Sequence, residues 1–145
     1  MRIRPIGVIH TSYKRVEDVP IQPCYSQGVG EVEVFKEYEE GLEDIEGFSH
    51  IIILYLFHKS QGYSLSVKPF LDSGQHGVFA TRYPNRHNPI GVSVVTLLEK
   101  RENILRVKGV DVLDGTPLID TKPYVPIFDQ VTNAKIGWLE GKAQR

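Results

Sequence analysis

The sequence predicts a mainly β domain, either an all-β sheet or a small barrel, with one short helix and long loops. About five to seven short segments are apolar or alternate between apolar and polar residues, which is the pattern of β-strands. One segment, residues 36–45, is rich in Glu and is followed by Gly47, as a short helix would be. Strands and helices do not alternate along the chain, which argues against a doubly wound α/β fold.

The first half of the chain contains three predicted strands. Ile6–Ile9 is a short apolar strand, and residues 31–35 begin with the strict alternation of a half-buried strand. Residues 51–57 are apolar on both faces and β-branched, so we expect a central strand covered on both sides. Residues 13–28 contain two prolines and form a long connection between the first two strands.

The second half continues with short strands and a polar loop. We expect residues 60–77 to be irregular, residues 78–80 to form a brief strand, and residues 81–89 to form a loop. Further on, two segments separated by the polar turn 100–103 predict a β-hairpin, in which Leu105 and Val107 face inward and Arg106 and Lys108 face outward. The strands predicted in this part of the chain are residues 90–98, 104–110 and 118–119.

Length and composition limit the class of protein. The 145 residues fit one domain, residues 1–145, and the formal net charge of −1 gives no support for a broad phosphate-binding surface. The lone Cys24 allows no intrachain disulfide, which is typical of a reducing compartment. The longest apolar run, residues 51–57, is far below the roughly 18 residues that span a bilayer, and no signal peptide is recognised. We therefore expect a cytoplasmic protein that does not bind membranes.

Two common kinds of site are not predicted. Gly28-Val29-Gly30 lacks the preceding strand and following helix that a nucleotide-binding glycine loop needs, so a dinucleotide fold is not expected. His50 and His58 belong to one predicted strand but would lie about 26 Å apart, too far to share an ion. With no cysteine pair either, we expect no metal.

The loop from Arg82 to Gly91 is the first candidate for chemistry. It contains two arginines, Arg82 and Arg86, and two asparagines, Asn85 and Asn88. A guanidinium group is a rigid double donor suited to a carboxylate or phosphate, and an amide can read the donor and acceptor on an adenine edge. From composition alone, a solvated turn explains this loop equally well.

Three further segments have polar residues where a ligand could bind. Asp114 stands in an Asp-Gly-Thr-Pro turn, and its carboxylate could accept from a ribose hydroxyl or an adenine amine, although a plain turn is the favoured interpretation. His58-Lys59 follows the most apolar strand and marks either a surface or a crevice at the strand end. Lys122 and Tyr124 could supply a cation and a stacking surface for nucleic acid, or could be part of a proline-rich turn.

Taken in order, these segments resemble the TrmO/YaeB family, also described as TsaA-like proteins. The resemblance covers about residues 6–126 and rests on several motifs in consistent order. The motifs are Ile6-Gly7-Val8-Ile9, Gly41-Leu42-Glu43, Phe48-Ser49-His50, Phe57-His58, Gly77-Val78-Phe79-Ala80-Thr81-Arg82, Asn88-Pro89-Ile90-Gly91, Asp114-Gly115-Thr116-Pro117, Asp120 and Lys122-Pro123-Tyr124-Val125-Pro126.

The resemblance implies a single-sheet β-barrel that binds S-adenosylmethionine and works as a homodimer. It further implies methyl transfer to the exocyclic amine of threonylcarbamoyladenosine, the tRNA nucleoside next to the anticodon. We expect Asn88 or a nearby backbone carbonyl to hold the acceptor amine and Arg86 to hold a phosphate or the threonyl carboxylate, with Lys122 and Tyr124 contacting the substrate. The cofactor contacts that the resemblance implies are Pro20, Ile21, Gln22, His58, Lys59, Arg82, Val92, Asp114, Gly115, Thr116 and Pro117.

Three departures from the family pattern leave alternatives open. Ile21 replaces an arginine that the family often has, and His87 replaces a proline in the usual Arg-Pro-Asn-Pro. We also expect no C-terminal extension domain after Arg145, which longer members carry. The alternatives are a methyltransferase for a small molecule or another RNA, and a non-catalytic module that binds S-adenosylmethionine.

Overall fold

The computed structural model describes residues 1–19, 28–69 and 74–142. The chain divides into two compact units: unit 1 is Met1–His58 with Ile90–Tyr124, and unit 2 is Lys59–Pro89 with Val125–Arg145. The expectation of one domain over residues 1–145 stays a prediction. Within the described residues, no helix is long and apolar enough to cross a bilayer.

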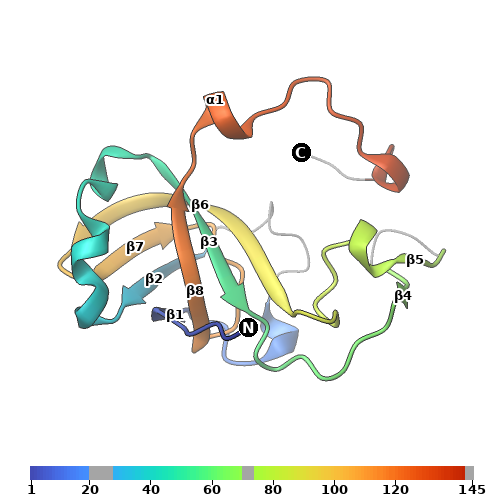
Figure 1. Cartoon of the computed structure of the whole chain (residues 1–145), viewed down its shortest axis with the longest axis horizontal. Coiled ribbons are helices and arrows are strands. Elements are labelled where there is room, and N and C mark those ends of the chain that lie inside the picture. Colours follow the sequence, from blue (N-terminus) through green and yellow to red (C-terminus); the bar gives the residue numbers. More distant parts are fainter. Residues whose placement is uncertain (20–27, 70–73, 143–145) are drawn as a thin grey trace. The chain divides into compact units, whose positions relative to one another are not determined.

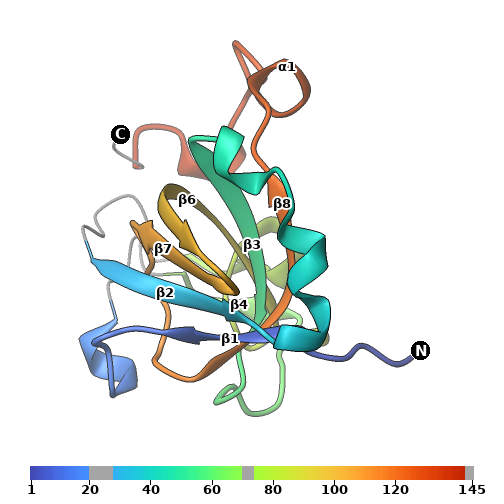
Figure 2. The same ribbon diagram turned by 90° about the vertical axis from the view of Figure 1, so that its left-hand side faces the viewer.

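Unit 1 is a closed barrel of antiparallel strands in the order β1-β2-β7-β6-β3-β8. Figures 1 and 2 show the strands curving around a common interior. The prediction of a mainly β chain with a small single-sheet barrel is confirmed. The barrel strands are β1 (Gly7–His10), β2 (Val29–Val34), β3 (His50–Leu56), β6 (Ile90–Arg101), β7 (Ile104–Lys108) and β8 (Thr116–Pro123).

The core fills the interior of this barrel. Alternate residues of each strand point inward, so that β3 contributes Ile51, Ile53 and Tyr55. Leu105 and Val107 are fully buried, as predicted for β7. Burying one such aliphatic side chain contributes about 1.5–3 kcal/mol to the free energy of folding. Because every barrel strand has such an inward face, burial of these faces favours the closed barrel.

The expectation that β3 is covered on both faces is wrong for this chain. Its outward residues Ile52 and Leu54 are only half-buried. They pair across the sheet with Val94 and Val92 of β6, which are exposed. The apolar run of β3 therefore reflects one buried face and one apolar outer face, which periodicity cannot distinguish from two covered faces.

The predicted hairpin at residues 90–110 is confirmed as β6 and β7. β6 extends to Arg101, and Glu102 turns the chain with φ of 54°. The predicted strand at residues 118–119 is much longer in the structure, because β8 pairs with both β1 and β3 and so closes the barrel. Long-range pairing extends strands through residues with weak local preference.

The predicted helix at residues 36–45 is two 3-10 helices instead, η3 (Lys36–Leu42) and η4 (Ile45–Gly47). Asp44 separates them in the left-handed region, with φ of 71°. Leu42 and Ile45 join the barrel core, so packing of these two side chains determines the conformation of the segment. A third 3-10 turn, η1, spans Val16–Asp18.

Unit 2 contains more regular structure than the sequence predicts. The supposedly irregular residues 60–77 contain a two-stranded ladder of β4 (Ser66–Val67) and β5 (His76–Gly77). The predicted strand at residues 78–80 is wrong, since Val78–Ala80 forms a 3-10 turn, η5. Near the C-terminus the unit adds the α-helical turn α1 (Pro126–Asp129) and the 3-10 turn η6 (Gly137–Leu139).

Candidate functional site

The topology of unit 1 brings several predicted cofactor residues to one end of the barrel. Because all neighbouring strands are antiparallel, the ends of β1, β3 and β7 lie at the same barrel end as the starts of β2, β6 and β8. His58 follows β3, Val92 lies near the start of β6, and Asp114 to Pro117 lead into β8. We call this barrel end the loop end; its residues are separated widely in sequence.

The Asp114 turn at the loop end is tied firmly to the segment after β1. Asp114 Oδ1 accepts from the Thr11 backbone N–H at 2.9 Å, and Oδ2 accepts from Lys14 Nζ at 2.8 Å. The hydrogen bond from Lys14, followed by that from Thr11, lowers the pKa of the Asp114 carboxyl below its usual value. Gly115 takes φ of 84° and donates its N–H to Ile9 O at 2.9 Å. Asp114 therefore holds the turn together.

A buried polar chain runs behind this turn. The hydroxyl groups of Tyr55 and Ser93 share a hydrogen bond of 2.7 Å, and Ser93 donates to Asp111 Oδ1 at 3.0 Å. Burial raises the pKa of the Asp111 carboxyl. The Tyr55 and Phe57 rings meet edge to face at 5.6 Å, and a Cβ on Gly91 would overlap both rings. This explains the glycine of the Asn-Pro-Ile-Gly motif.

A mixed-charge groove of about 570 Å³ extends from the loop end over the outside of β1, β2 and β7. Besides the Lys14–Asp114 pair, it contains a His10 Nε2–Glu33 Oε1 contact of 2.8 Å and the side chain of Arg106. The titratable side chains of the groove that are hydrogen-bonded thus have their partners within it, and such exposed pairs contribute little to stability.

Lys122 and Tyr124 do not lie at the loop end. They follow β8 toward its far end, about 20 Å from Thr116 at the rise of an extended strand. Lys122 Nζ donates to Asp120 Oδ2 at 2.9 Å, and this bond raises the pKa of the Lys122 ammonium. Tyr124 packs edge to face with His50 at 6.4 Å. Within one chain, this pair and the predicted cofactor residues of unit 1 lie at opposite barrel ends.

In unit 2, Arg86 holds the loop that contains it. Its Nη1 donates to Thr81 O at 2.9 Å and to Tyr83 O at 3.1 Å, and its Nη2 donates to Val78 O at 3.3 Å. These backbone partners account for the position of the guanidinium. The structure thus gives Arg86 a role in positioning residues 78–86, a role the sequence did not suggest.

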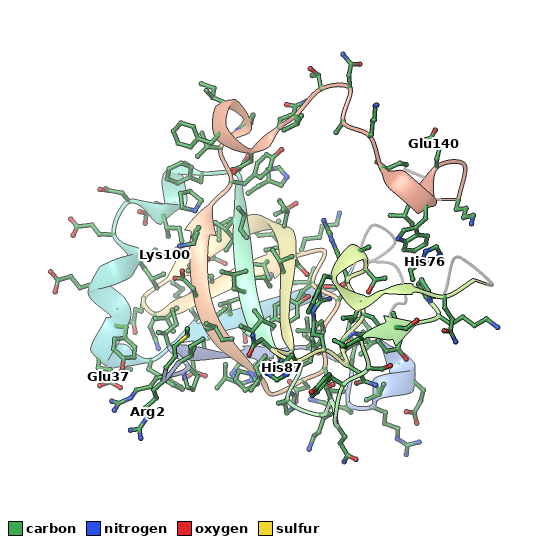
Figure 3. The ribbon with its side chains drawn as sticks, turned by 45° about the vertical axis from the view of Figure 1, so that its right-hand side comes forward. Arg2, Glu37, His76, His87, Lys100 and Glu140 are labelled. Atoms are coloured by element: carbon green, nitrogen blue, oxygen red, sulfur yellow. The ribbon has the colours of Figure 1, made fainter. Side chains whose placement is uncertain are left out.

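A pocket of about 450 Å³ lies beside this loop in unit 2. Tyr63 and His87 meet edge to face there, with ring centroids 4.8 Å apart and planes at 84°. Figure 3 labels His87 among the side chains of this part of the chain. The lining residues are Tyr63, Leu65, Phe79, Arg86, His87 and Asn88. The structure therefore brings the two predicted catalytic residues, Asn88 and Arg86, to one pocket.

A second tether comes from the C-terminal segment of unit 2. Trp138 Nε1 donates to Ala80 O at 2.8 Å, and the Trp138 ring stacks on His76 at 4.4 Å with planes at 16°. The partner could not be found from local pattern, since the bond spans 58 residues.

The remaining predicted residues are distributed as follows. Lys59 and Arg82 are exposed in unit 2, and Val92 is 40% exposed on the outer face of β6. Pro20, Ile21 and Gln22 lie outside the described residues. Sequence reasoning assigned no site role to the pocket residues Tyr63 and Phe79. Tyr63 was a single aromatic ring in a polar loop, and Phe79 was noted only as part of a family motif. Among the described residues, no cluster of His, Cys, Asp or Glu has the makings of a metal site.

Comparison with known proteins places this arrangement in a class. The model of the tRNA-methyltransferase O N-terminal domain matches residues 8–130. A Pyrococcus abyssi protein described as a probable S-adenosyl-L-methionine-binding protein is 57% identical over 138 residues, covering 94% of this chain and 75% of that protein. The Escherichia coli tRNA (adenine(37)-N6)-methyltransferase is 37% identical, covering 93% of this chain and 62% of the enzyme.

The fold agrees with that class. A crystal structure of TrmO from Pseudomonas aeruginosa matches with a TM-score of 0.79 and 36% identity, covering 95% of this chain and 62% of that one. The matched class is that of S-adenosylmethionine-dependent methyltransferase domains. This chain belongs to the TrmO family, as its sequence motifs predicted. It spans less than two-thirds of the solved bacterial chain and of the Escherichia coli enzyme.

Proposed function

We propose that this protein uses S-adenosylmethionine to methylate the exocyclic amine of threonylcarbamoyladenosine in tRNA. The observation that carries the proposal is the gathering of His58, Val92 and the Asp114–Pro117 turn at the loop end of a TrmO-family barrel. The relatives named as tRNA (adenine(37)-N6)-methyltransferases support the reaction, and the archaeal relative named as an S-adenosyl-L-methionine-binding protein supports the cofactor.

The chemistry of the proposed cofactor residues fits S-adenosylmethionine. Lys59 and Arg82 are exposed cations that can bind its carboxylate, and Val92 offers an apolar surface for its adenine ring. The tightly bonded Asp114 turn would present backbone groups, since both its carboxylate oxygens already have partners. Arg86 is not needed for this binding, because its donors serve the backbone of its own loop.

When bound, S-adenosylmethionine would supply a methyl group on a positively charged sulfur. The amine nitrogen would form a bond to the methyl carbon in line with the carbon–sulfur bond that breaks, S-adenosylhomocysteine would leave, and the proton of the amine would pass to water. The protein's contribution is alignment, because the adenosine amine needs no strong base before the new bond forms. The amide oxygen of Asn88 accepts from the acceptor amine, and its nitrogen donates to the neighbouring ring nitrogen. Arg86 acts as a positioning residue that holds the loop leading to Asn88.

The finer parts of the proposal concern the acceptor and the assembly. The threonylcarbamoyl group is the expected acceptor feature, and a homodimer is the expected working form. A second chain would also offer a place for Lys122 and Tyr124, which lie at the barrel end away from the loop end. In this arrangement they would contact tRNA bound at the partner's site.

Transfer of labelled methyl from S-adenosylmethionine to tRNA tests the proposal. The tRNA comes from cells with and without the threonylcarbamoyl modification, and an active bacterial enzyme serves as the positive control. Label confined to the modified tRNA is the expected result. Label in both pools, or label in neither with an active control, contradicts the proposed acceptor.

A second candidate function has one observation in its favour. The archaeal relatives bear the name of a binding protein without a stated reaction. A non-catalytic module would bind S-adenosylmethionine tightly, as measured by calorimetry, and would release no S-adenosylhomocysteine with any tRNA pool.

A further inference from the structure

The pocket of unit 2 is built mainly from flat rings. Tyr63 and Leu65 come from the segment before β4, Phe79 comes from η5, and His87 and Asn88 come from the loop before β6. Its volume of about 450 Å³ lies within the usual range of about 300–1,000 Å³ for small-ligand sites. Of the expected cofactor residues that the structure describes, none lines this pocket.

Phe79 is exposed although the backbone around it is firmly held. Backbone carbonyl groups of η5 and of Thr81 accept hydrogen bonds from side chains. Val78 O accepts from Thr81 Oγ1 at 2.8 Å, Ala80 O accepts from Trp138, and Thr81 O accepts from Arg86. Yet the Phe79 side chain is 76% exposed. Tyr63 and Leu65, which line the same pocket, are 56% and 62% exposed, so Phe79 belongs to a group of exposed apolar side chains, and such a group marks a contact surface for a partner.

The walls and the polar groups of the pocket favour an uncharged aromatic ligand. Tyr63 and His87 stand at 84° to each other, so a third flat ring can stack on one and meet the other by its edge. Asn88 offers one donor and one acceptor, which match the exocyclic amine and adjacent ring nitrogen of adenine. Among the described residues, the lining contains no carboxylate, and Arg86 makes the pocket unfavourable for the positively charged sulfonium of the cofactor.

We propose that this pocket receives the adenine ring of the acceptor nucleoside, with Phe79 and Tyr63 as its stacking surfaces and Asn88 at its polar edge. The proposal rests on the proposed function and names the part of the site that binds the base. An enzyme that acts on a base must take it out of the stack and hold it, and aromatic side chains serve this purpose without reading sequence.

The test measures methyl transfer to modified tRNA with the tRNA and the cofactor varied separately. Phe79→Ala should lower kcat/KM for tRNA by about 10-fold or more, the effect of losing one stacked base. The affinity for S-adenosylhomocysteine, measured by calorimetry, should stay within about two-fold of wild type because the cofactor binds elsewhere. Phe79→Tyr keeps a ring and should restore most of kcat/KM.

Phe128→Ala is the matched control, because Phe128 is also in unit 2, is 79% exposed and does not line the pocket. It should leave kcat/KM for tRNA unchanged. Wild-type kcat/KM in Phe79→Ala would overturn the proposal, as would an equal loss of affinity for S-adenosylhomocysteine, which would assign the pocket to the cofactor's own adenine. Circular dichroism of each variant shows whether it is folded.

A direct binding experiment separates this proposal from the proposed function. Adenosine monophosphate is titrated into the full chain while the ring resonances of Phe79, Tyr63 and His87 are followed by NMR. Shifts at these rings support the pocket even if the wild type transfers no methyl to tRNA. If these ring resonances do not shift up to the solubility limit of the nucleotide, the proposal is overturned, whatever the enzyme methylates.

Discussion

The role of Arg86 can be tested by separating its charge from its geometry. Arg86→Lys keeps the positive charge but loses the planar double donor that reaches Thr81 O at 2.9 Å and Tyr83 O at 3.1 Å. Arg86→Gln removes the charge as well. If Arg86 holds its own loop, both variants should impair the enzyme. If Arg86 instead binds a substrate anion, lysine should keep much of the activity.

The magnitude follows from the bonds that are lost. Arg86 makes three hydrogen bonds to its loop, and each contributes about 0.5–1.5 kcal/mol net, so a replacement that keeps one and loses two destabilises the ordered loop by about 1–3 kcal/mol. This corresponds to about a 5- to 150-fold shift of the equilibrium between the ordered and open loop. We expect a fall of that order in kcat/KM for tRNA in both variants, provided that the open loop does not bind the acceptor.

Hydrogen exchange provides the independent measurement. Amide exchange across residues 78–86 should accelerate in Arg86→Lys and in Arg86→Gln. Arg82→Lys, in the same loop, serves as the control and should leave this exchange unchanged, because Arg82 is exposed. The reasoning would be refuted if Arg86→Lys kept wild-type kcat/KM and wild-type amide exchange while Arg86→Gln lost most of its kcat/KM. That result would mean that Arg86 acts through its positive charge.

Three further predictions concern stability and the far end of the barrel. Gly91→Ala should lower the free energy of unfolding, measured in urea, by about 1–3 kcal/mol, because the added Cβ overlaps packed rings. Gly41→Ala should leave this free energy unchanged or raise it slightly, because the space around Gly41 is open. Asp111→Asn should raise the melting temperature at neutral pH, because the pKa of Asp111 is raised in the folded state and its ionisation with rising pH therefore costs stability. Asp114→Asn should lower the melting temperature at neutral pH. The difference from wild type should vanish as the pH falls below 3.8 through the lowered pKa of Asp114 in the folded state. Equal melting temperatures at neutral pH would contradict both expectations. Lys122→Ala should leave the calorimetric affinity for S-adenosylhomocysteine unchanged and raise KM for tRNA; a loss of cofactor affinity would show that the far barrel end contributes to that site.

Local pattern was sufficient where apolar and polar residues alternate along a strand, although it was not sufficient for the uniformly apolar run of β3. The alternation at residues 104–108 predicted the burial of Leu105 and Val107, and the structure confirms it. The same reasoning failed at Val78–Ala80, where a short apolar segment became a 3-10 turn. The carbonyl group of Val78 accepts a hydrogen bond from Arg86, eight residues away, and that of Ala80 accepts one from Trp138, 58 residues away. The conformation therefore depends on side chains outside the apolar segment itself.

The candidate site, like the fold, was only partly predicted from the sequence. The loop with Arg86 and Asn88 was found from its composition, because arginine and asparagine in a turn carry recognisable chemistry. Its aromatic partners Tyr63 and Phe79 were not found, since a single ring in an irregular segment has no periodicity to mark it. The partners of Asp114 were missed too, because Thr11 lies 103 residues away.

By itself, the sequence determined the class of fold, the inward face of the strands and the family, because these depend on alternation and on motifs in order. Only the tertiary structure decided which residues meet. Closure of the barrel sets His58, Val92 and the Asp114 turn at one end and Lys122 at the other. In unit 2, short-range hydrogen bonds from Arg86 and a hydrogen bond from Trp138 across 58 residues hold the turn that displays Phe79. The Trp138 bond joins residues whose separation in the chain carries no local signal, so only the folded arrangement defines it.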